Sequence, residues 1–120
     1  MLSAAHRLTD GATFQRAVRT GRRSGSRTLV VHLASQAVPE GAAGPRIGFV
    51  VSKAVGNAVV RNRVKRRLRH LAREHVSSLP GSAVLVVRAL PAAAGASYAE
   101  LGSDLTRGLS RVAAPSGGPR

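Results

Sequence analysis

The residues best suited to chemistry are the basic side chains between Lys53 and Arg73. This segment carries eight lysines and arginines, and no acidic residue lies between Glu40 and Glu74. At about 100° per residue, one helix face holds Asn62, Arg66, Arg69 and Arg73. A solvated face usually mixes charge signs, whereas close like charges destabilise an isolated helix by ~0.2–0.5 kcal/mol per pair. The pattern therefore favours an anionic ligand over an ordinary solvated face, and the chemistry it predicts is phosphate binding.

No residue of this chain is predicted to carry out catalysis. The sequence has no P-loop, no dinucleotide-binding glycine motif, no His-Glu-x-x-His motif and no Gly-x-Ser-x-Gly motif. It has no cysteine, its five carboxylates are scattered, and its four histidines lack the spacing of metal ligands. We therefore expect no catalytic residue and no metal ligand in this protein.

The composition points to a polyanionic partner. The 120 residues include 19 lysines and arginines against five acidic residues, which gives a formal charge of +14. Hydrophobic residues make up 43%, enough for a folded core. Nucleic acid is the first candidate partner and an anionic membrane surface the second. Because no apolar run approaches the ~20 residues that cross a bilayer, and no signal-peptide core begins the chain, we expect a cytoplasmic protein with no membrane partner.

Hydrophobic periodicity and turn residues predict a single domain over residues 1–112 and a flexible tail over 113–120. The predicted elements are a helix over 9–20, strands over 28–34 and 46–52, a helix over 58–77, a strand over 83–88 and a helix over 97–112. Residues 21–27 form a basic turn or a short strand, 35–45 a long hairpin loop, and 91–96 a linker. The almost wholly apolar strand over 83–88 is expected to be covered on both faces.

These elements predict an α+β fold, an α/β sandwich with helices packed on a mixed sheet of about four strands. The apolar stripe of the 58–77 helix, opposite its basic face, comprises Val60, Val64, Leu68 and Leu71. The 97–112 helix begins with a capping box, Ser97 to Glu100. The general rule of chirality predicts a right-handed crossover for the strand–helix–strand unit over 46–88.

Base stacking has few candidate residues in this sequence. The aromatic side chains are Phe14, Phe49 and Tyr98. The aromatic motif of RNA-recognition sheets is missing, and we expect Tyr98 to pack in the core. Recognition should therefore depend on phosphates and shape, with at most a small apolar cleft.

One segment, residues 47–69, resembles the signature of the bacterial ribonuclease P protein component. The family's hallmark is a Ser52-Lys53 pair and a Gly56-Asn57-Ala58 turn, followed by Arg61-Asn62-Arg63. The resemblance covers nearly the whole chain, since 14–21 looks like the family's first helix and the last strand and helix fall in the family's positions. It implies an αβ sandwich whose crossover is left-handed, against the general rule.

The resemblance also implies a function. Members of this family are cofactors of a catalytic RNA that removes the 5′ leader of precursor tRNA by magnesium-dependent phosphodiester hydrolysis. The protein would be a subunit of this endoribonuclease, and the RNA would carry the catalysis. The implied partners are ribonuclease P RNA and precursor tRNA, with Mg²⁺ bound mainly by RNA and no obligate protein partner.

The resemblance carries over to particular residues of this chain. The implied RNA-binding positions are Arg61, Asn62, Arg63, Lys65, Arg66 and Arg69, to which the basic face adds Arg73. The implied residues of a cleft for the single-stranded leader are Phe14, Lys53 and His32. Family members often carry aromatic residues where Val18 and His32 stand in this chain.

The residues leave two other functions open. A structural RNA-binding protein of ribosomal type would need the same charge but no cleft. A nuclease with its own active site would cleave RNA without an RNA partner. The RNA that accompanies the protein, and cleavage tests on the protein alone, would separate these functions.

Overall fold

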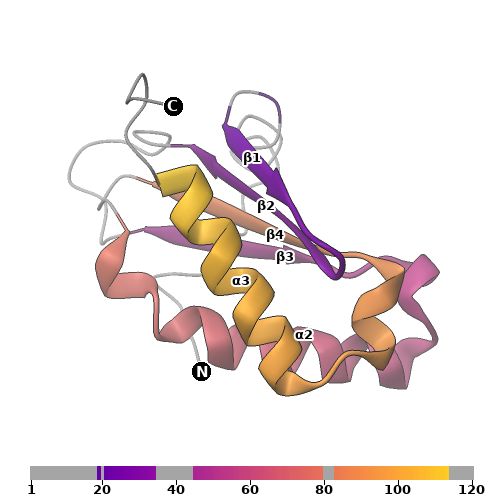
Figure 1. Cartoon of the computed structure of the whole chain (residues 1–120). Coiled ribbons are helices and arrows are strands. Elements are labelled where there is room, and N and C mark those ends of the chain that lie inside the picture. Colours follow the sequence, from indigo (N-terminus) through magenta and orange to yellow (C-terminus); the bar gives the residue numbers. More distant parts are fainter. Residues whose placement is uncertain (1–18, 20, 35–44, 80–82, 114–120) are drawn as a thin grey trace.

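Figure 1 shows a computed structural model of the chain, which describes residues 19, 21–34, 45–79 and 83–113. The predicted 9–20 helix lies almost wholly outside these residues, as do Phe14, Val18 and the chain beyond 113. The strands are β1 (Arg22–Gly25), β2 (Leu29–Ala34), β3 (Arg46–Val50) and β4 (Val84–Ala89). The helices are α2 (Ala58–Arg73) and α3 (Tyr98–Ala113), with 3₁₀ turns η2 (Lys53–Val55), η3 (Val76–Ser78) and η4 (Pro91–Gly95). The segment expected as a linker therefore contains the η4 turn.

The four strands form one mixed sheet in the order β1-β2-β4-β3. β2 pairs antiparallel with both β1 and β4, whereas β3 pairs parallel with β4. The predicted hairpin between 28–34 and 46–52 is therefore wrong, because β4 lies between these two strands. The four residues from Val84 to Val87 are fully buried, at 0% exposure. Burial of both faces suits an interior strand, and β4 takes the interior position by separating β2 from β3.

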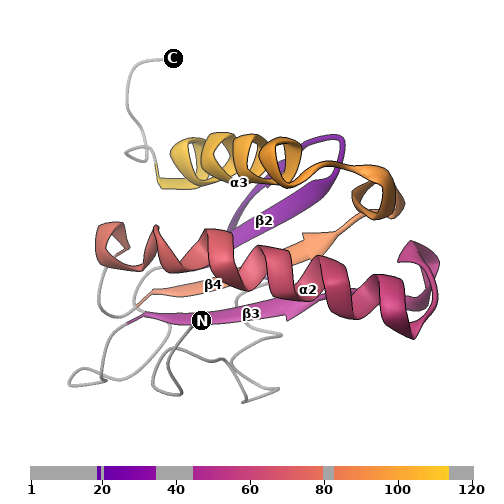
Figure 2. The ribbon, with the colours of Figure 1, turned by 90° about the horizontal axis from the view of Figure 1, so that it is seen from below.

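The crossover from β3 through α2 to β4 is left-handed. In Figure 1, β3 runs from left to right and β4 lies above β3, and Figure 2 shows that α2 lies on the same side of the sheet as α3, toward the viewer of Figure 1. With the strands turned upright and the helix toward the viewer, β4 would stand to the left of β3. About 98% of such units have the opposite hand. The family resemblance predicted this feature correctly, and the general rule did not.

Both helices cover the same face of the sheet, so the core has two layers (Figure 2). Alternate strand residues point to that face and pack against one side of each helix. The core includes Leu29, Val31, Leu33, Ile47, Leu85 and Val87 from the sheet, with Val64, Leu68, Leu101 and Leu105 from the helices. The intervening strand residues, among them Arg23, His32 and Arg88, alternate to the opposite face.

The predicted faces of α2 are confirmed. Val64 and Leu68 are fully buried, whereas Asn62 and Arg66 are exposed. The helix begins after Asn57, whose side-chain oxygen accepts a hydrogen bond from the backbone N–H of Val60 at 3.0 Å. It ends earlier than predicted, and the η3 turn follows it.

The predicted capping box of α3 is confirmed. Ser97 Oγ accepts a hydrogen bond from the Glu100 N–H at 3.1 Å, and Glu100 Oε1 accepts one from the Ser97 N–H at 2.9 Å. Tyr98, which was expected in the core, is 44% exposed. It is the first residue of α3 and precedes Leu101, where the buried stripe of the helix begins.

Candidate nucleic-acid interface

The outer face of α2 is a stripe of polar and cationic side chains without acidic neighbours on the helix. Asn62, Arg66 and Arg73 are exposed, and Arg69 is half-buried. The ion pairs of the described residues, Arg27–Glu100 and Arg107–Asp104, both lie outside this helix. The stripe therefore keeps its positive charge, as a surface that binds phosphates requires.

A second group of basic residues lies at the start of α2. Lys53 is exposed in η2, one turn of chain before the helix. The Arg61 side chain folds back, and its Nε donates a hydrogen bond to the carbonyl oxygen of Gly56 at 3.2 Å. Gly56 adopts φ of 156°, and an added Cβ would lie 3.0 Å from Val60. This turn therefore needs glycine, and it fixes Arg61 beside the helix start.

Two arginines on a flank of α2 have a different environment. Arg63 Nη2 donates a hydrogen bond to the carbonyl oxygen of Ala94, and Arg67 Nη1 donates one to that of Ala96, both at 3.3 Å. Arg63 Nε is buried and has no hydrogen-bond partner among the described residues. Both side chains thus anchor the segment around η4. Arg67 was absent from the predicted site, although its spacing of four residues from Arg63 places both on one flank.

Lys65 lies on the opposite flank of the helix and is half-buried. The predicted RNA-binding residues thus divide into three groups. Asn62, Arg66, Arg69 and Arg73 form the outer stripe, Arg61 and Lys65 lie on one flank, and Arg63 lies on the flank that faces η4.

The sheet face opposite the helices carries His32, which is buried at 2% exposure. His32 lies beside Arg23 of β1 and Val86 of β4 in the strand register. Burial, and then the positive charges of Arg88 and Arg23, lower the pKa of its imidazole, so the ring is neutral at pH 7. Neither ring nitrogen has a hydrogen-bond partner among the described residues.

The predicted leader cleft is only partly described. His32 is in β2, and Lys53 follows the end of β3, an edge strand of the same sheet. Phe14 lies outside the described residues. The structure therefore gives the surroundings of His32 and the exposure of Lys53, and it leaves their joint role as a prediction.

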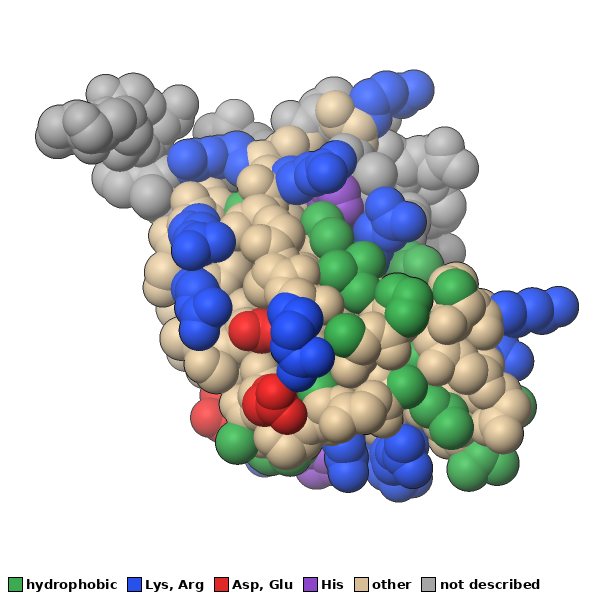
Figure 3. Space-filling view, turned by 45° about the vertical axis from the view of Figure 1, so that its right-hand side comes forward, with side chains coloured by type: hydrophobic (Ala, Val, Ile, Leu, Met, Phe, Trp, Pro, Cys, Tyr) green, Lys and Arg blue, Asp and Glu red, His purple; other side chains and the backbone are tan. Residues whose placement is uncertain are grey.

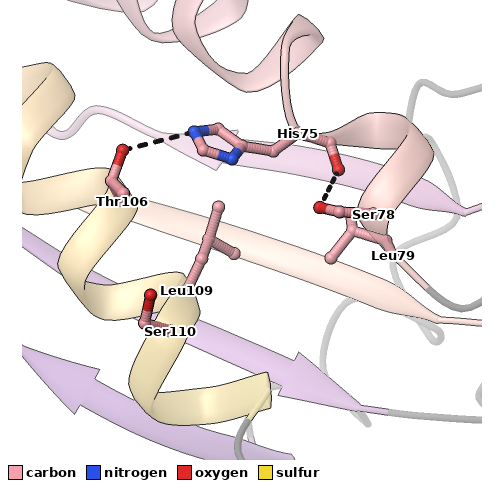
Figure 4. Close-up of a pocket in the computed structure, with 6 residues that line it drawn as sticks. All are labelled: His75, Ser78, Leu79, Thr106, Leu109 and Ser110. Atoms are coloured by element: carbon pink, nitrogen blue, oxygen red, sulfur yellow. Dashed lines mark hydrogen bonds between the residues drawn. The ribbon is translucent and has the colours of Figure 1, made fainter.

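A small hollow of about 210 Å³ separates the end of α2 from α3 (Figure 4). His75 Nε2 points across it to Thr106 Oγ1 at 3.5 Å, with Leu79 and Leu109 beside them. No carboxylate lines this hollow, so it lacks a general acid–base pair. Within the described ranges, no cluster of three or more His, Cys, Asp or Glu side chains suits a metal ion. The helices in those ranges are too short or too polar to span a membrane.

The fold and the basic helix together define a class, that of small α+β proteins with one strongly cationic helix on the sheet. The family model described as Ribonuclease P matches residues 2–113 of this chain. The chain is 72% identical over 114 residues to the ribonuclease P protein component of a Nocardioides species, a match that covers 95% of this chain and 97% of that protein. A relative from Streptomyces avermitilis with the same name is 53% identical over 117 residues, covering 93% and 95% of the two chains. The chain belongs to the ribonuclease P protein family, the protein subunits of the tRNA-processing endoribonuclease ribonuclease P.

Solved structures agree with this assignment. The RNase P protein of Staphylococcus aureus superposes with a TM-score of 0.76 at 28% identity, over 88% of this chain and 94% of that one. The RNase P protein of Thermotoga maritima has a TM-score of 0.69 at 22% identity, over 84% and 92% of the two chains. The second likeness shows that the fold persists where little of the sequence is shared.

Proposed function

We propose that the outer stripe of α2 binds the ribonuclease P RNA. The observation that carries this proposal is the set of arginines on one face of a helix that has no acidic residue. The ion pairs of the described residues, Arg27–Glu100 and Arg107–Asp104, do not involve these arginines. Phosphates of an RNA helix would supply the missing negative charge and relieve the like-charge repulsion within α2. Arg61 and Lys65 extend the same surface along one flank of the helix.

The second part of the proposal concerns the substrate. The sheet face with His32, Arg23 and Arg88 receives the single-stranded 5′ leader of precursor tRNA, with Lys53 and Phe14 as further contacts. His32 is buried and neutral, so it would lie beneath this face and position the exposed residues around it. The exposed guanidinium groups of Arg23 and Arg88 suit the flanking phosphates.

The chain's contribution to the reaction is then electrostatic and positional. The Mg²⁺ of phosphodiester hydrolysis would be bound mainly by the RNA. The protein lowers the repulsion between two polyanions and orients the leader, which are contributions of charge and proximity. The complex of protein, ribonuclease P RNA and precursor tRNA works in the cytoplasm without an obligate second protein.

Sequencing the RNA that copurifies with the protein from cells tests the first part. We expect one abundant catalytic RNA, and its amount should fall in a variant with Arg66→Ala and Arg69→Ala. Enrichment of ribosomal RNA in its place would support the structural RNA-binding function and overturn the proposal.

Incubation of RNA-free protein with precursor tRNA and Mg²⁺ tests whether the RNA subunit, and not the protein, carries the catalysis. We expect no cleavage at the mature 5′ end at any magnesium concentration, and cleavage when the RNA subunit is added. One solved relative is a variant of the Staphylococcus aureus protein described as defective in mRNA degradation. An mRNA is therefore a second substrate for this test. Site-specific cleavage of precursor tRNA by protein free of contaminating nuclease would reject RNA-borne catalysis.

A further inference from the structure

A second charged stripe runs along α3, on the side that faces β1. Residues 100, 104, 107 and 111 fall within a narrow arc at about 100° per residue, away from the buried leucines. Glu100 and Asp104 fix the direction of this arc. Glu100 pairs with Arg27 at 2.7 Å, and Asp104 accepts a hydrogen bond from the hydroxyl of Thr28, so the stripe points to the β1–β2 end of the sheet.

Each acidic residue of this stripe lies beside an arginine, and Arg111 adds a further positive charge without an ion pair among the described residues. Arg27 holds Glu100, and the backbone N–H of Ser97 donates to Glu100 as well. Asp104 is mostly shielded and lies 3.9 Å from Arg107, whose side chain is 55% exposed. Arg111 is exposed one turn further along. With Arg27 counted, the stripe therefore has an excess of positive charge at the end that holds Arg107 and Arg111. Figure 3 shows basic side chains around the few acidic ones on this side of the molecule.

β1 links this cationic end to the other face of the sheet. Its neighbouring residues Arg22 and Arg23 alternate between faces, as strand residues do. Arg22 pairs with Leu33, a core residue, and therefore lies on the side that α3 covers. Arg23 pairs with His32 and lies on the opposite side. Because β1 is an edge strand with arginines on both faces, positive charge continues around the edge of the sheet.

We infer that the flank formed by Arg22, Arg107 and Arg111 binds the phosphate backbone of the upstream part of the precursor-tRNA leader. This inference rests on the proposed binding of the leader beside His32. A flexible single strand can follow a surface that turns around the edge of a sheet, whereas a duplex, with a persistence length of about 50 nm, cannot. Phosphates, and not bases, are the ligand, since the aromatic side chains of the described residues, Phe49 and Tyr98, lie in β3 and at the first residue of α3.

The experiment measures the affinity of the holoenzyme for precursor tRNAs whose leaders lengthen one nucleotide at a time. In the wild-type holoenzyme we expect the affinity to rise twice as the leader lengthens. The first gain in affinity comes from the nucleotides next to the cleavage site, and the later gain comes from the upstream nucleotides. The variant with Arg107→Ala and Arg111→Ala should lose the later gain, about threefold to tenfold for two exposed contacts. For long leaders only, the slope of its log affinity against log salt should also flatten by about 1–2 units.

Two matched variants control for net charge. The pair Arg66→Ala and Arg69→Ala removes the same charge from α2, and it should weaken RNA-subunit binding while keeping the later gain. The pair Arg107→Lys and Arg111→Lys keeps the charge and should keep the gain. A later gain that is absent in the wild type, or that persists in the Arg107/Arg111 alanine variant, overturns this inference. If the first gain in affinity is absent as well, the proposed leader site beside His32 is rejected. Failure of this inference and failure of the proposed function therefore give different results.

Discussion

The guanidinium group of Arg63 donates a hydrogen bond across 3.3 Å to the carbonyl oxygen of Ala94. This contact joins α2 to the η4 turn that precedes α3. Arg63 belongs to the Arg-Asn-Arg motif, which the resemblance assigns to RNA binding, and yet its side chain serves the fold. One motif therefore contains an outward residue, Asn62, and an anchoring residue, Arg63.

Replacing Arg63 by alanine should lower the free energy of unfolding by about 0.5–1.5 kcal/mol, because the Ala94 carbonyl loses its partner. The same change at exposed Arg66 should leave that free energy unchanged. Denaturant unfolding of both variants measures the difference. Equal stabilities would show that the Arg63 contact contributes nothing to folding.

Replacing Arg66 and Arg69 together by alanine should leave folding stability unchanged or slightly raised, since like charges are removed from one helix face. Affinity for the ribonuclease P RNA should fall, and the slope of log affinity against log salt should flatten by ~1–2 units. Higher magnesium should largely restore cleavage, because the ion itself screens repulsion between the RNAs. Thermal melting, RNA titrations at several salt concentrations and cleavage assays provide these measurements.

The Val64→Ala variant should show the opposite behaviour. Val64 is fully buried on the inner face of α2, so its truncation leaves a cavity that costs about 1–3 kcal/mol of stability. The salt slope of RNA binding should stay at the wild-type value, because no phosphate contact is lost. An unfolded double-arginine variant beside a Val64→Ala variant with a reduced slope would mean that α2 faces the other way.

Features set by neighbours in the sequence could be predicted from the residues alone. The two faces of α2 follow from helical periodicity, since Val64 and Leu68 recur every four residues and Asn62 and Arg66 fall opposite. The capping box at Ser97 is equally local, because its two hydrogen bonds join residues three apart.

Features set by distant contacts could not be predicted from the residues alone. Strands at 28–34 and 46–52 are consecutive, and the preference for pairing neighbours favoured a hairpin. Burial of β4 on both faces outweighed that preference. Because β4 lies between β2 and β3, the chain reaches it from β3 by the crossover through α2. The hand of this crossover came from the family resemblance only. The anchoring role of Arg63 could not be predicted either, because the carbonyl oxygen that accepts its hydrogen bond belongs to Ala94, 31 residues away.

The last prediction concerns His32 and pH. In the unfolded chain the imidazole has its ordinary pKa of about 6.5, whereas burial and then Arg88 and Arg23 lower the pKa in the folded protein. Between the two pKa values the unfolded state binds more protons, so stability rises with pH there. The free energy of unfolding should therefore be constant above about pH 7.5 and fall as pH decreases below 6.5.

His32→Leu should abolish this decrease and leave stability at pH 7 unchanged or higher, since it replaces a buried polar ring that has no partner among the described residues. His70→Gln is the matched control, because His70 is exposed in the last turn of α2 and its replacement should keep the decrease. Thermal melts from pH 5.5 to 7.5 measure the effect. Glu100 does not interfere, because its pKa is lowered from 4.5 by the Ser97 N–H and by Arg27, so it titrates below this window. A decrease that persists in His32→Leu would place its source in another group.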